Sequence, residues 1–344
     1  MVRRILSNAV GAMVERAPVT MVLRLMGIPV VGFMYHVVSE KQLPHIRHLY
    51  SYKTPDALEE DVRFIKQTFN LVSFEELLLC VSNGRRWAKP IAFISFDDGM
   101  AECFQYARPI LLEHHVPCIF FISTGFIGNK MACYRHMVSL CIERVVQATS
   151  DTRSLMLRAL RDAVDCAAFD VEGFVKWIKG LKWADRHALD VACRTLGVDE
   201  RTFLQDVQPY MTVEQLTQLA SDGFALGGHG RVHVQLGQVQ QPELEAEIVE
   251  SCKIIREISK AERVPFAFPF SGSGVDRRLL CDIMARNPFI SLVFDTQEFA
   301  KDQRFIVNRI GADEPSRLGP NVGTAASVVR QACIREIQLR FGVT

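Results

Sequence analysis

The chain has 344 residues, of which 49% are hydrophobic and 23% are charged, and its net charge is +1. This length suits one large α/β domain or two domains, and the composition excludes global disorder. The near-neutral charge argues against nucleic acid as a main partner, because nucleic-acid-binding domains usually carry a basic excess. The ten cysteines form no C-x-x-C pair, so we expect reduced thiols rather than a zinc ribbon or a disulfide framework.

Residues 1–28 form the first predicted unit, a basic amphipathic helix. Residues 1–27 carry four arginines against one glutamate, and no convincing signal-peptide cleavage site follows the first apolar run. The run from Val19 to Val31 is interrupted by Arg24 and is too short to span a bilayer. Two interpretations stay open: a helix lying on a membrane surface, or a helix packed on the rest of the protein. We expect a cytoplasmic protein, peripheral to the inner face of the membrane under the first interpretation.

Short apolar runs bounded by turn residues predict buried strands along the chain. They lie at 28–38, 71–72, 91–96, 116–122, 224–228, 266–270, 291–295 and 306–310. Helical patterns fall between most of them, at 54–66, 73–80, 104–115, 212–222 and 242–260. Strands that alternate with helices predict a parallel sheet covered by outer helices.

The stretch 131–210 differs, because it has helical periodicity and little strand character. We interpret it as a helical insertion between two strands, serving either as a substrate lid or as a dimer surface. Residues 316–323 are rich in Gly and Pro and predict a linker, and 324–341 predict a terminal amphipathic helix. The predicted units are therefore 1–28, a main domain over 29–315, and a linker with a helix over 316–344.

Two adjacent carboxylates, Asp97 and Asp98, follow the apolar run 91–96 and precede Gly99. At the end of a strand, both side chains can reach one pocket from different directions. One interpretation is a metal ligand beside a general base. The other is an Asp-Asp-Gly turn that only stops the strand, because Asp and Gly are common turn residues.

Two histidines, His229 and His233, follow a pair of glycines after another apolar run. Four-residue spacing on a helical turn places both imidazoles on one side, where they can chelate one ion. The glycines allow a close approach of the backbone. Two unrelated histidines remain the alternative. With a carboxylate from another strand end, the set becomes two His and one carboxylate, which suits a divalent metal with a position open for water.

At this point the sequence resembles the polysaccharide deacetylases, a carbohydrate esterase family that shares the nodulation-factor deacetylase homology domain. The resemblance covers roughly residues 29–312 and rests on motifs in the family's order. These are Ser-Phe-Asp-Asp-Gly at 95–99, His-x-x-x-His at 229–233, Phe-x-x-Pro-Phe at 266–270, the Met-Thr-x-x-Gln-Leu helix at 211–216, and Tyr35-His36. The resemblance implies a distorted (β/α) barrel of about seven parallel strands, with a helical insertion and helical N- and C-terminal extensions.

The resemblance also implies roles for individual residues. Asp98, His229 and His233 would hold one divalent ion, zinc first, with cobalt, nickel or manganese as alternatives. Asp97 would be the general base. A backbone N–H near Phe270 would stabilise the oxyanion, and Tyr35 would lie on the substrate side. Such a metal lowers the pKa of bound water, and a neighbouring carboxylate can take its proton.

The chain departs from the family pattern in three places. Ala267 stands where many members carry an Arg that orients the base, and Arg309 on the last predicted strand is the candidate replacement. No His follows His233, so the usual general acid is missing. His36 is the candidate for that role, and a strand-end histidine hydrogen-bonded in the core is the alternative. Gly230 stands where Ser or Thr is common, which leaves the loop shape open.

The predicted function is that of a metal-dependent deacetylase, a hydrolase of non-peptide carbon–nitrogen bonds. Its substrate would be the N-acetyl group of an amino sugar in a polysaccharide, oligosaccharide or lipid-linked glycan. An O-acetyl esterase acting on carbohydrate is the first alternative. A catalytically inactive carbohydrate-binding or scaffold protein of polysaccharide biosynthesis is the second. A cytoplasmic location favours lipid-linked or nucleotide-derived sugars over a mature cell-wall polymer.

Overall fold

The computed structural model describes residues 11, 14–83, 89–164, 170–314 and 324–341. Seven parallel strands close into a barrel, because β1 pairs with β8 on one side and with β3 on the other, and β2 adds to the outer edge of β3. The strands are β1 (Val30–Tyr35), β2 (Asn70–Leu71), β3 (Ile91–Phe96), β4 (Cys118–Ile122), β5 (Ala225–Gly228), β6 (Val264–Ala267), β7 (Ile290–Asp295) and β8 (Ile306–Gly311). This confirms the predicted (β/α) barrel of about seven parallel strands.

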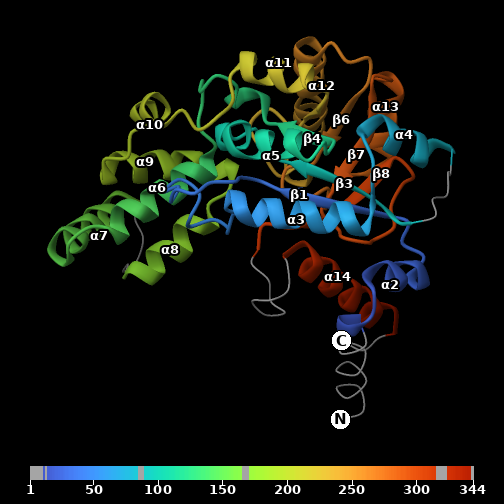
Figure 1. Cartoon of the computed structure of the whole chain (residues 1–344). Coiled ribbons are helices and arrows are strands. Elements are labelled where there is room, and N and C mark those ends of the chain that lie inside the picture. The colour runs from blue at the N-terminus through green and yellow to red at the C-terminus, as the bar shows by residue number, and fades with distance from the viewer. Residues whose placement is uncertain (1–10, 12–13, 84–88, 165–169, 315–323, 342–344) are drawn as a thin grey trace.

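Helices surround the barrel (Figure 1). Side chains cap several of these helices at their predicted starts. Thr54 caps α3, Thr212 and Gln215 form a capping box at α11, and Ser73 and Glu76 exchange hydrogen bonds at the start of α4. The helices around the barrel are α3 (Pro55–Thr68), α4 (Phe74–Asn83), α5 (Arg108–Glu113), α11 (Val213–Ser221), α12 (Gln241–Ser259) and α13 (Arg277–Arg286). The expected helix 104–115 begins as a π-helical turn, η1 (Cys103–Ala107), before α5.

Aromatic side chains fill the barrel interior. Phe294 contacts Phe93 and Phe121, with ring centroids 5.4 and 5.1 Å away, and all three side chains are buried. Their neighbour on β1 is Gly32, where an added Cβ would lie 2.4 Å from the Phe93 ring and 2.9 Å from Arg309 Cγ. The glycine therefore leaves room for a large ring and a guanidinium side by side in the barrel.

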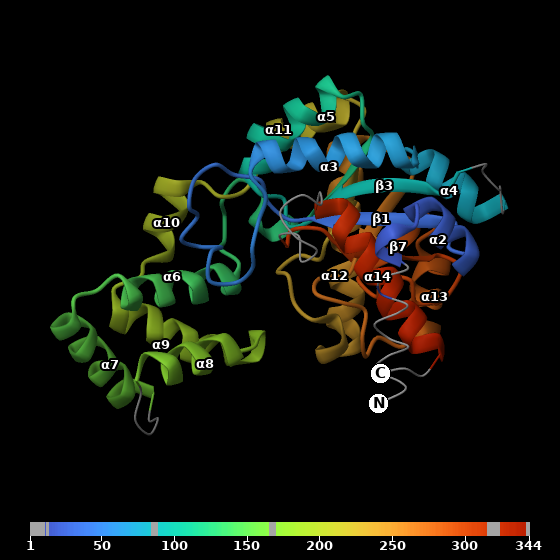
Figure 2. The same ribbon diagram turned by 60° about the horizontal axis from the view of Figure 1, so that its bottom comes forward.

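The stretch 131–210 is helical, as predicted, and projects to one side of the barrel (Figures 1 and 2). It contains α6 (Tyr134–Val146), α7 (Ser150–Val164), α8 (Val171–Gly180), α9 (Arg186–Leu196) and α10 (Glu200–Val207). Its helices pack around buried side chains of their own, among them Phe174 and Leu160. The insertion is tied back to the barrel by Met211, whose N–H donates to the carbonyl of Gly99 at 3.0 Å.

Helices near the two ends of the chain lie side by side beneath the barrel (Figure 1). α2 (Val19–Met26) buries Val22 and Leu23, and α14 (Thr324–Phe341) holds it through Arg330, which donates to the carbonyl of Ala17 at 2.8 Å. The described part of the N-terminal segment therefore packs on the protein itself. The predicted linker 316–323 lies outside the described residues. No described helix has the length and apolar character needed to cross a membrane.

A buried carboxylate joins α14 to the barrel. Asp61 on α3 accepts the N–H of Ala325 at 2.6 Å and the hydroxyl of Tyr35 at 3.1 Å. Lys53 Nζ lies 3.2 Å from the same carboxylate, and both charged groups are almost fully buried. Burial raises the pKa of Asp61, and the charge of Lys53 opposes that shift. The charged groups of this cluster pair with one another inside the protein.

Candidate functional site

Polar side chains gather where the barrel strands end. In parallel barrels the carboxyl ends of all strands meet at one face. Asp97 and Asp98 follow β3 directly, and the backbone turns there because Asp98 and Gly99 adopt φ values of 75° and 81°. The left-handed conformation is costly for most residues but tolerated by Asp and natural for Gly. It sends the two carboxylates in different directions, as the sequence predicts.

Asp98, His229 and His233 converge on one point. Asp98 Oδ1 lies 3.4 Å from His229 Nε2 and 3.1 Å from His233 Nε2, and the three ligand atoms lie within 4.8 Å of one another. His229 donates from Nδ1 to the carbonyl of Ala267 at 2.9 Å, which leaves the Nε2 lone pair for a ligand. Within the described ranges, this is the one His/Cys/Asp/Glu group that could hold a metal ion. The donor set fits zinc or a similar divalent ion.

The two histidines lie on a loop after β5, and the expected helical turn between them is wrong. Gly230 has φ 71° and His233 has φ 55°, so left-handed residues bring the imidazoles together, with ring centroids 5.0 Å apart. Glu247 on α12 holds this loop, because its Oε2 accepts the N–H groups of Arg231 at 2.6 Å and Val232 at 3.1 Å. A Cβ at position 230 would lie 2.9 Å from that oxygen, which explains the glycine.

Asp97 is held by Arg309, the residue that the sequence suggests as a replacement for the missing arginine. Arg309 donates from Nη1 to Asp97 Oδ1 at 2.6 Å and from Nη2 to Oδ2 at 2.9 Å. Its guanidinium carbon lies 5.0 Å from the Phe121 ring centroid, and the side chain is fully buried in the barrel. Burial raises the pKa of Asp97, but Arg309 and His229 outweigh this effect and hold that pKa below its usual value. Asp97 is therefore an ionised, oriented carboxylate.

His36 follows β1 and pairs with Asp313, which follows β8. Its Nδ1 lies 2.5 Å from Asp313 Oδ2, and its backbone N–H donates to Oδ1 of the same carboxylate at 3.1 Å. Burial lowers the pKa of His36, but Asp313, Asp98 and Asp97 more than offset it and raise that pKa to about 9. The imidazole is therefore protonated at neutral pH in the metal-free protein. His36 is thus hydrogen-bonded at a strand end, as the alternative expects, but its side chain is 23% exposed and lines the cavity described below.

Phe270 and Tyr35 occupy different surroundings. Phe270 is 41% exposed with φ 60°, its ring lies 4.6 Å from that of His233, and its N–H has no acceptor among the described residues. The expected place of Tyr35 on the substrate side is wrong. Its hydroxyl donates to Asp61 on the outer side of β1, because neighbouring strand residues point to opposite faces and His36 takes the inner one.

A cavity of about 410 Å³ lies over the metal-ligand group. Its walls include Asp97, Asp98, His36, both loop histidines and Phe270. Tyr50, which the sequence analysis did not identify, also lines it and directs its hydroxyl toward Asp98 Oδ2 at 3.5 Å. Cys133, Arg135 and His136 bring the insertion into the same wall. The insertion therefore forms part of the wall of this cavity.

Comparisons with known proteins give one family match and several similar solved structures. A family model for polysaccharide deacetylase matches residues 183–284, a range that contains both loop histidines and lies after the two aspartates. A search of curated proteins finds no match. The fold is similar to that of the Streptococcus pyogenes deacetylase PplD in complex with acetate, at TM-score 0.55 and 15% identity over 87% of this chain and 97% of that one. It is also similar to IcaB from Ammonifex degensii, at TM-score 0.52 and 14% identity over 89% and 97% of the two chains. These likenesses show the fold. The family match adds that the stretch 183–284 is similar to the polysaccharide deacetylases.

Proposed function

We propose that this protein removes the N-acetyl group of an amino sugar in a polysaccharide, oligosaccharide or lipid-linked glycan. The observation that carries the proposal is the pairing of two adjacent groups at the end of β3. Asp98 faces two imidazole Nε2 atoms, while Asp97 is clamped by Arg309 beside them. Hydrolysis of an amide needs an activated water, a base for its proton and an acid for the leaving amine, and one cavity offers a candidate for each.

We propose Asp98, His229 and His233 as the ligands of one divalent ion, zinc first. When bound, such an ion lowers the pKa of water toward neutrality and polarises an acyl oxygen. His229 is oriented for this by its bond to the carbonyl of Ala267, and Glu247 fixes the loop that carries both imidazoles. Asp98 itself is placed by the left-handed turn after β3.

Asp97 is the proposed general base. It is ionised and has both oxygens engaged by Arg309, so it can accept a proton without rotating away from the cavity. The paired arginine then stabilises the carboxylate between turnovers. The N–H of Phe270, which faces no acceptor among the described residues, is the proposed donor to the developing oxyanion.

His36 is the proposed general acid that protonates the leaving amine. It lines the cavity, and its Nδ1 is occupied by Asp313, so Nε2 is the atom that carries the proton toward the substrate. The raised pKa keeps that proton in place at neutral pH. Asp313 acts as its positioning residue by fixing the ring through both the side chain and the backbone of His36.

The test is acetate release from a short oligomer of N-acetylglucosamine by zinc-loaded protein. Wild type should release acetate, Asp97→Asn should release little, and Asp282→Asn on the exposed face of α13 should match wild type. Equal activity of Asp97→Asn and wild type would refute the proposed base. Release only from an O-acetylated sugar would favour the esterase, and no release from either would favour a binding protein.

We also propose that the protein acts in the cytoplasm on sugars that are still lipid-linked or nucleotide-derived. The support is the use of cysteine, since all nine described cysteines are free thiols. Fractionation of cells that produce the tagged full chain tests this. Recovery in the cytoplasmic fraction is expected, and recovery outside the cytoplasmic membrane would refute it.

A further inference from the structure

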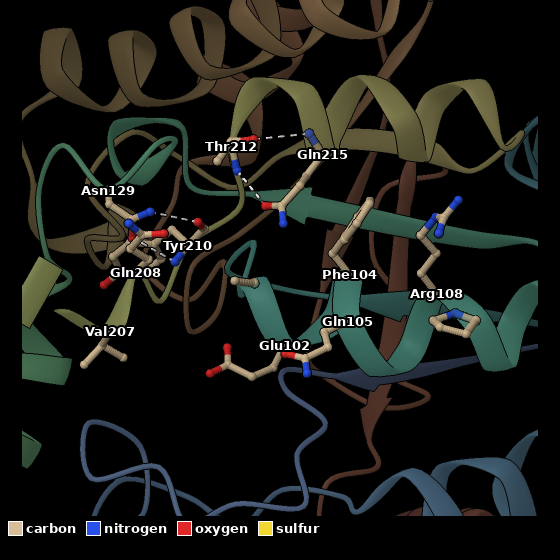
Figure 3. Close-up of a pocket in the computed structure, with 12 residues that line it drawn as sticks. Glu102, Phe104, Gln105, Arg108, Asn129, Val207, Gln208, Tyr210, Thr212 and Gln215 are labelled. Carbon is tan, nitrogen blue, oxygen red and sulfur yellow. Dashed lines mark hydrogen bonds between the residues drawn. The ribbon is translucent and has the colours of Figure 1, made fainter. Parts of the chain in front are cut away.

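A second cavity, of about 530 Å³, opens beside the barrel away from the metal-ligand group. One wall is the start of the π-helical turn and α5, and the other is the segment that joins α10 to α11 (Figure 3). Its volume lies within the range of cavities that hold small molecules. None of the residues proposed above for catalysis or metal binding lines it.

The cavity contains a carboxylate with one oxygen that has no hydrogen-bond partner among the described residues. Glu102 extends from the first turn of the helix toward the side of the cavity that Val207 and Gln208 line (Figure 3). Its Oε2 is buried and has no hydrogen-bond partner among the described residues. Burial raises the pKa of Glu102, and a hydrogen bond from its own backbone N–H and the charge of Lys41 oppose that shift only in part. A buried, unpaired carboxylate oxygen is costly, and an ammonium group from a ligand would offset that cost.

Two side-chain amides line the same cavity as this carboxylate. Gln105 and Gln208 line the cavity with exposed side chains, and within the described ranges neither side chain makes a hydrogen bond to the protein. Each amide can donate to and accept from hydroxyl groups. The other polar residues of the wall are already engaged: Asn129 bonds the backbone of Tyr210 in both directions, and Arg108 pairs with Asp222. The unused groups of the cavity are thus one acid and two amides.

The cavity shares a wall with the catalytic face. Tyr210 borders the cavity, and its hydroxyl contacts His136 Nδ1 at 2.7 Å, a residue that lines the catalytic cavity. The next residue, Met211, donates to the carbonyl of Gly99, immediately after the Asp97-Asp98 pair. A ligand in the second cavity would therefore rest against the segment that holds the catalytic turn.

We propose that this second cavity binds a protonated amino-sugar unit, with its ammonium group on Glu102 and its hydroxyl groups on Gln105 and Gln208. The inference rests on the proposed function, because deacetylation converts an uncharged acetamide into the primary amine that such a site selects. A unit that has lost its acetyl group would be retained here, and a unit that still carries it would not. The second cavity would then hold a partly deacetylated chain while the catalytic cavity acts on another unit.

The experiment is a calorimetric titration of the metal-free full chain at pH 7 with D-glucosamine and, separately, with N-acetylglucosamine. The two sugars differ in the acetyl group alone, and glucosamine has no amide to hydrolyse. Glucosamine should bind at least about tenfold more tightly, since a hydrogen bond to a charged group changes affinity by that order. Glu102→Gln should weaken glucosamine binding about tenfold or more. Gln208→Gly should weaken it less and keeps the left-handed backbone, because φ there is 50°.

Glu262→Gln, at an exposed position before β6, is the matched control and should bind like wild type. Equal affinity for the two sugars, or wild-type affinity in Glu102→Gln, would overturn the proposal, as would an absence of binding at millimolar concentration. The titration needs no catalysis and is repeated in His233→Ala. Glucosamine binding without acetate release would refute the proposed function alone, and acetate release without glucosamine binding would refute the second site alone.

Discussion

Asp97 and Asp61 are two buried aspartates with opposite consequences. Both are at most 2% exposed, and each faces a buried basic side chain. Burial favours a raised pKa in both. For Asp97 the bidentate Arg309 and His229 overcome that effect and lower the pKa, whereas for Asp61 the pKa stays raised although Lys53 opposes the shift. Asp97 opens into a cavity, while Asp61 is enclosed by Tyr35, Lys53 and the start of α14.

Burial and pairing alone therefore do not mark a carboxylate that can serve catalysis. Asp61 has its partners inside the protein and holds α14 in place, so its charge serves the fold. Asp97 faces Arg309 on one side and the cavity with the metal-ligand group on the other, so its charge is available to a substrate. Four substitutions test this division between the proposed base and a structural carboxylate.

The largest effect is expected for Asp97→Asn in the zinc-loaded protein. Loss of the base should lower kcat about 10²- to 10⁴-fold, the usual contribution of general acid–base catalysis. Metal content should stay at the wild-type level, because Asp98 and the two histidines are unchanged. The check is kcat for acetate release beside elemental analysis of the same sample. A variant that lost its metal along with its activity would contradict a role as base alone.

Asp61→Ala should act on stability instead. Removing one partner of a buried ion pair costs about 3–5 kcal/mol, because Lys53 and the α14 terminus lose their acceptor. Urea unfolding of the metal-free protein measures this loss in the free energy of unfolding. The fraction that stays folded should keep kcat within about threefold of wild type. A large loss of kcat in folded protein would remove the distinction between the two aspartates.

Gly32→Ala should affect both properties to a smaller degree. The added methyl meets the Phe93 ring and Arg309 Cγ, and overpacking a core typically costs about 1–3 kcal/mol. Because Arg309 orients Asp97, kcat should also fall. Gly180→Ala, at a helical glycine with nothing within 4 Å of the added carbon, is the matched control. Equal stability of the two variants would show that the barrel interior is not as tightly filled as described.

Asp313→Asn should shift the pH dependence of catalysis. His36 must carry a proton to act as acid, and with Asp313 present its pKa is raised to about 9. Loss of that carboxylate should lower the pKa toward its ordinary value near 6.5. The alkaline decline of kcat/KM should therefore move to lower pH, while activity at pH 6 changes less. An unchanged alkaline limb would show that another group protonates the leaving amine.

Much of this architecture could be predicted from the sequence because local signals carry it. Short apolar runs give the strands, and Thr54 and Thr212 mark helix starts through their caps. The adjacent aspartates and the paired histidines lie next to strand ends, so parallel topology alone brings them together. Arg309 could be identified as a partner for Asp97 because it lies on the last strand, which returns beside β1 and closes the barrel.

The residues that were missed depend on contacts between distant segments. Tyr50 reaches Asp98 from a loop, Asp313 reaches His36 across 277 positions, and Glu247 holds the histidine loop from α12. No local pattern marks such contacts. The error at Tyr35 has a different cause, since alternation along β1 already places Tyr35 and His36 on opposite faces.

The most direct test of the metal site is elemental analysis of purified wild type beside the double variant His229→Ala/His233→Ala, both after zinc loading and dialysis. We predict about one zinc ion per chain in wild type and none in the double variant, with the variant still folded by circular dichroism. Absence of zinc, cobalt, nickel and manganese from loaded wild type would contradict the metal site and with it the proposed deacetylase. Equal metal in both proteins would place the ion elsewhere in the chain.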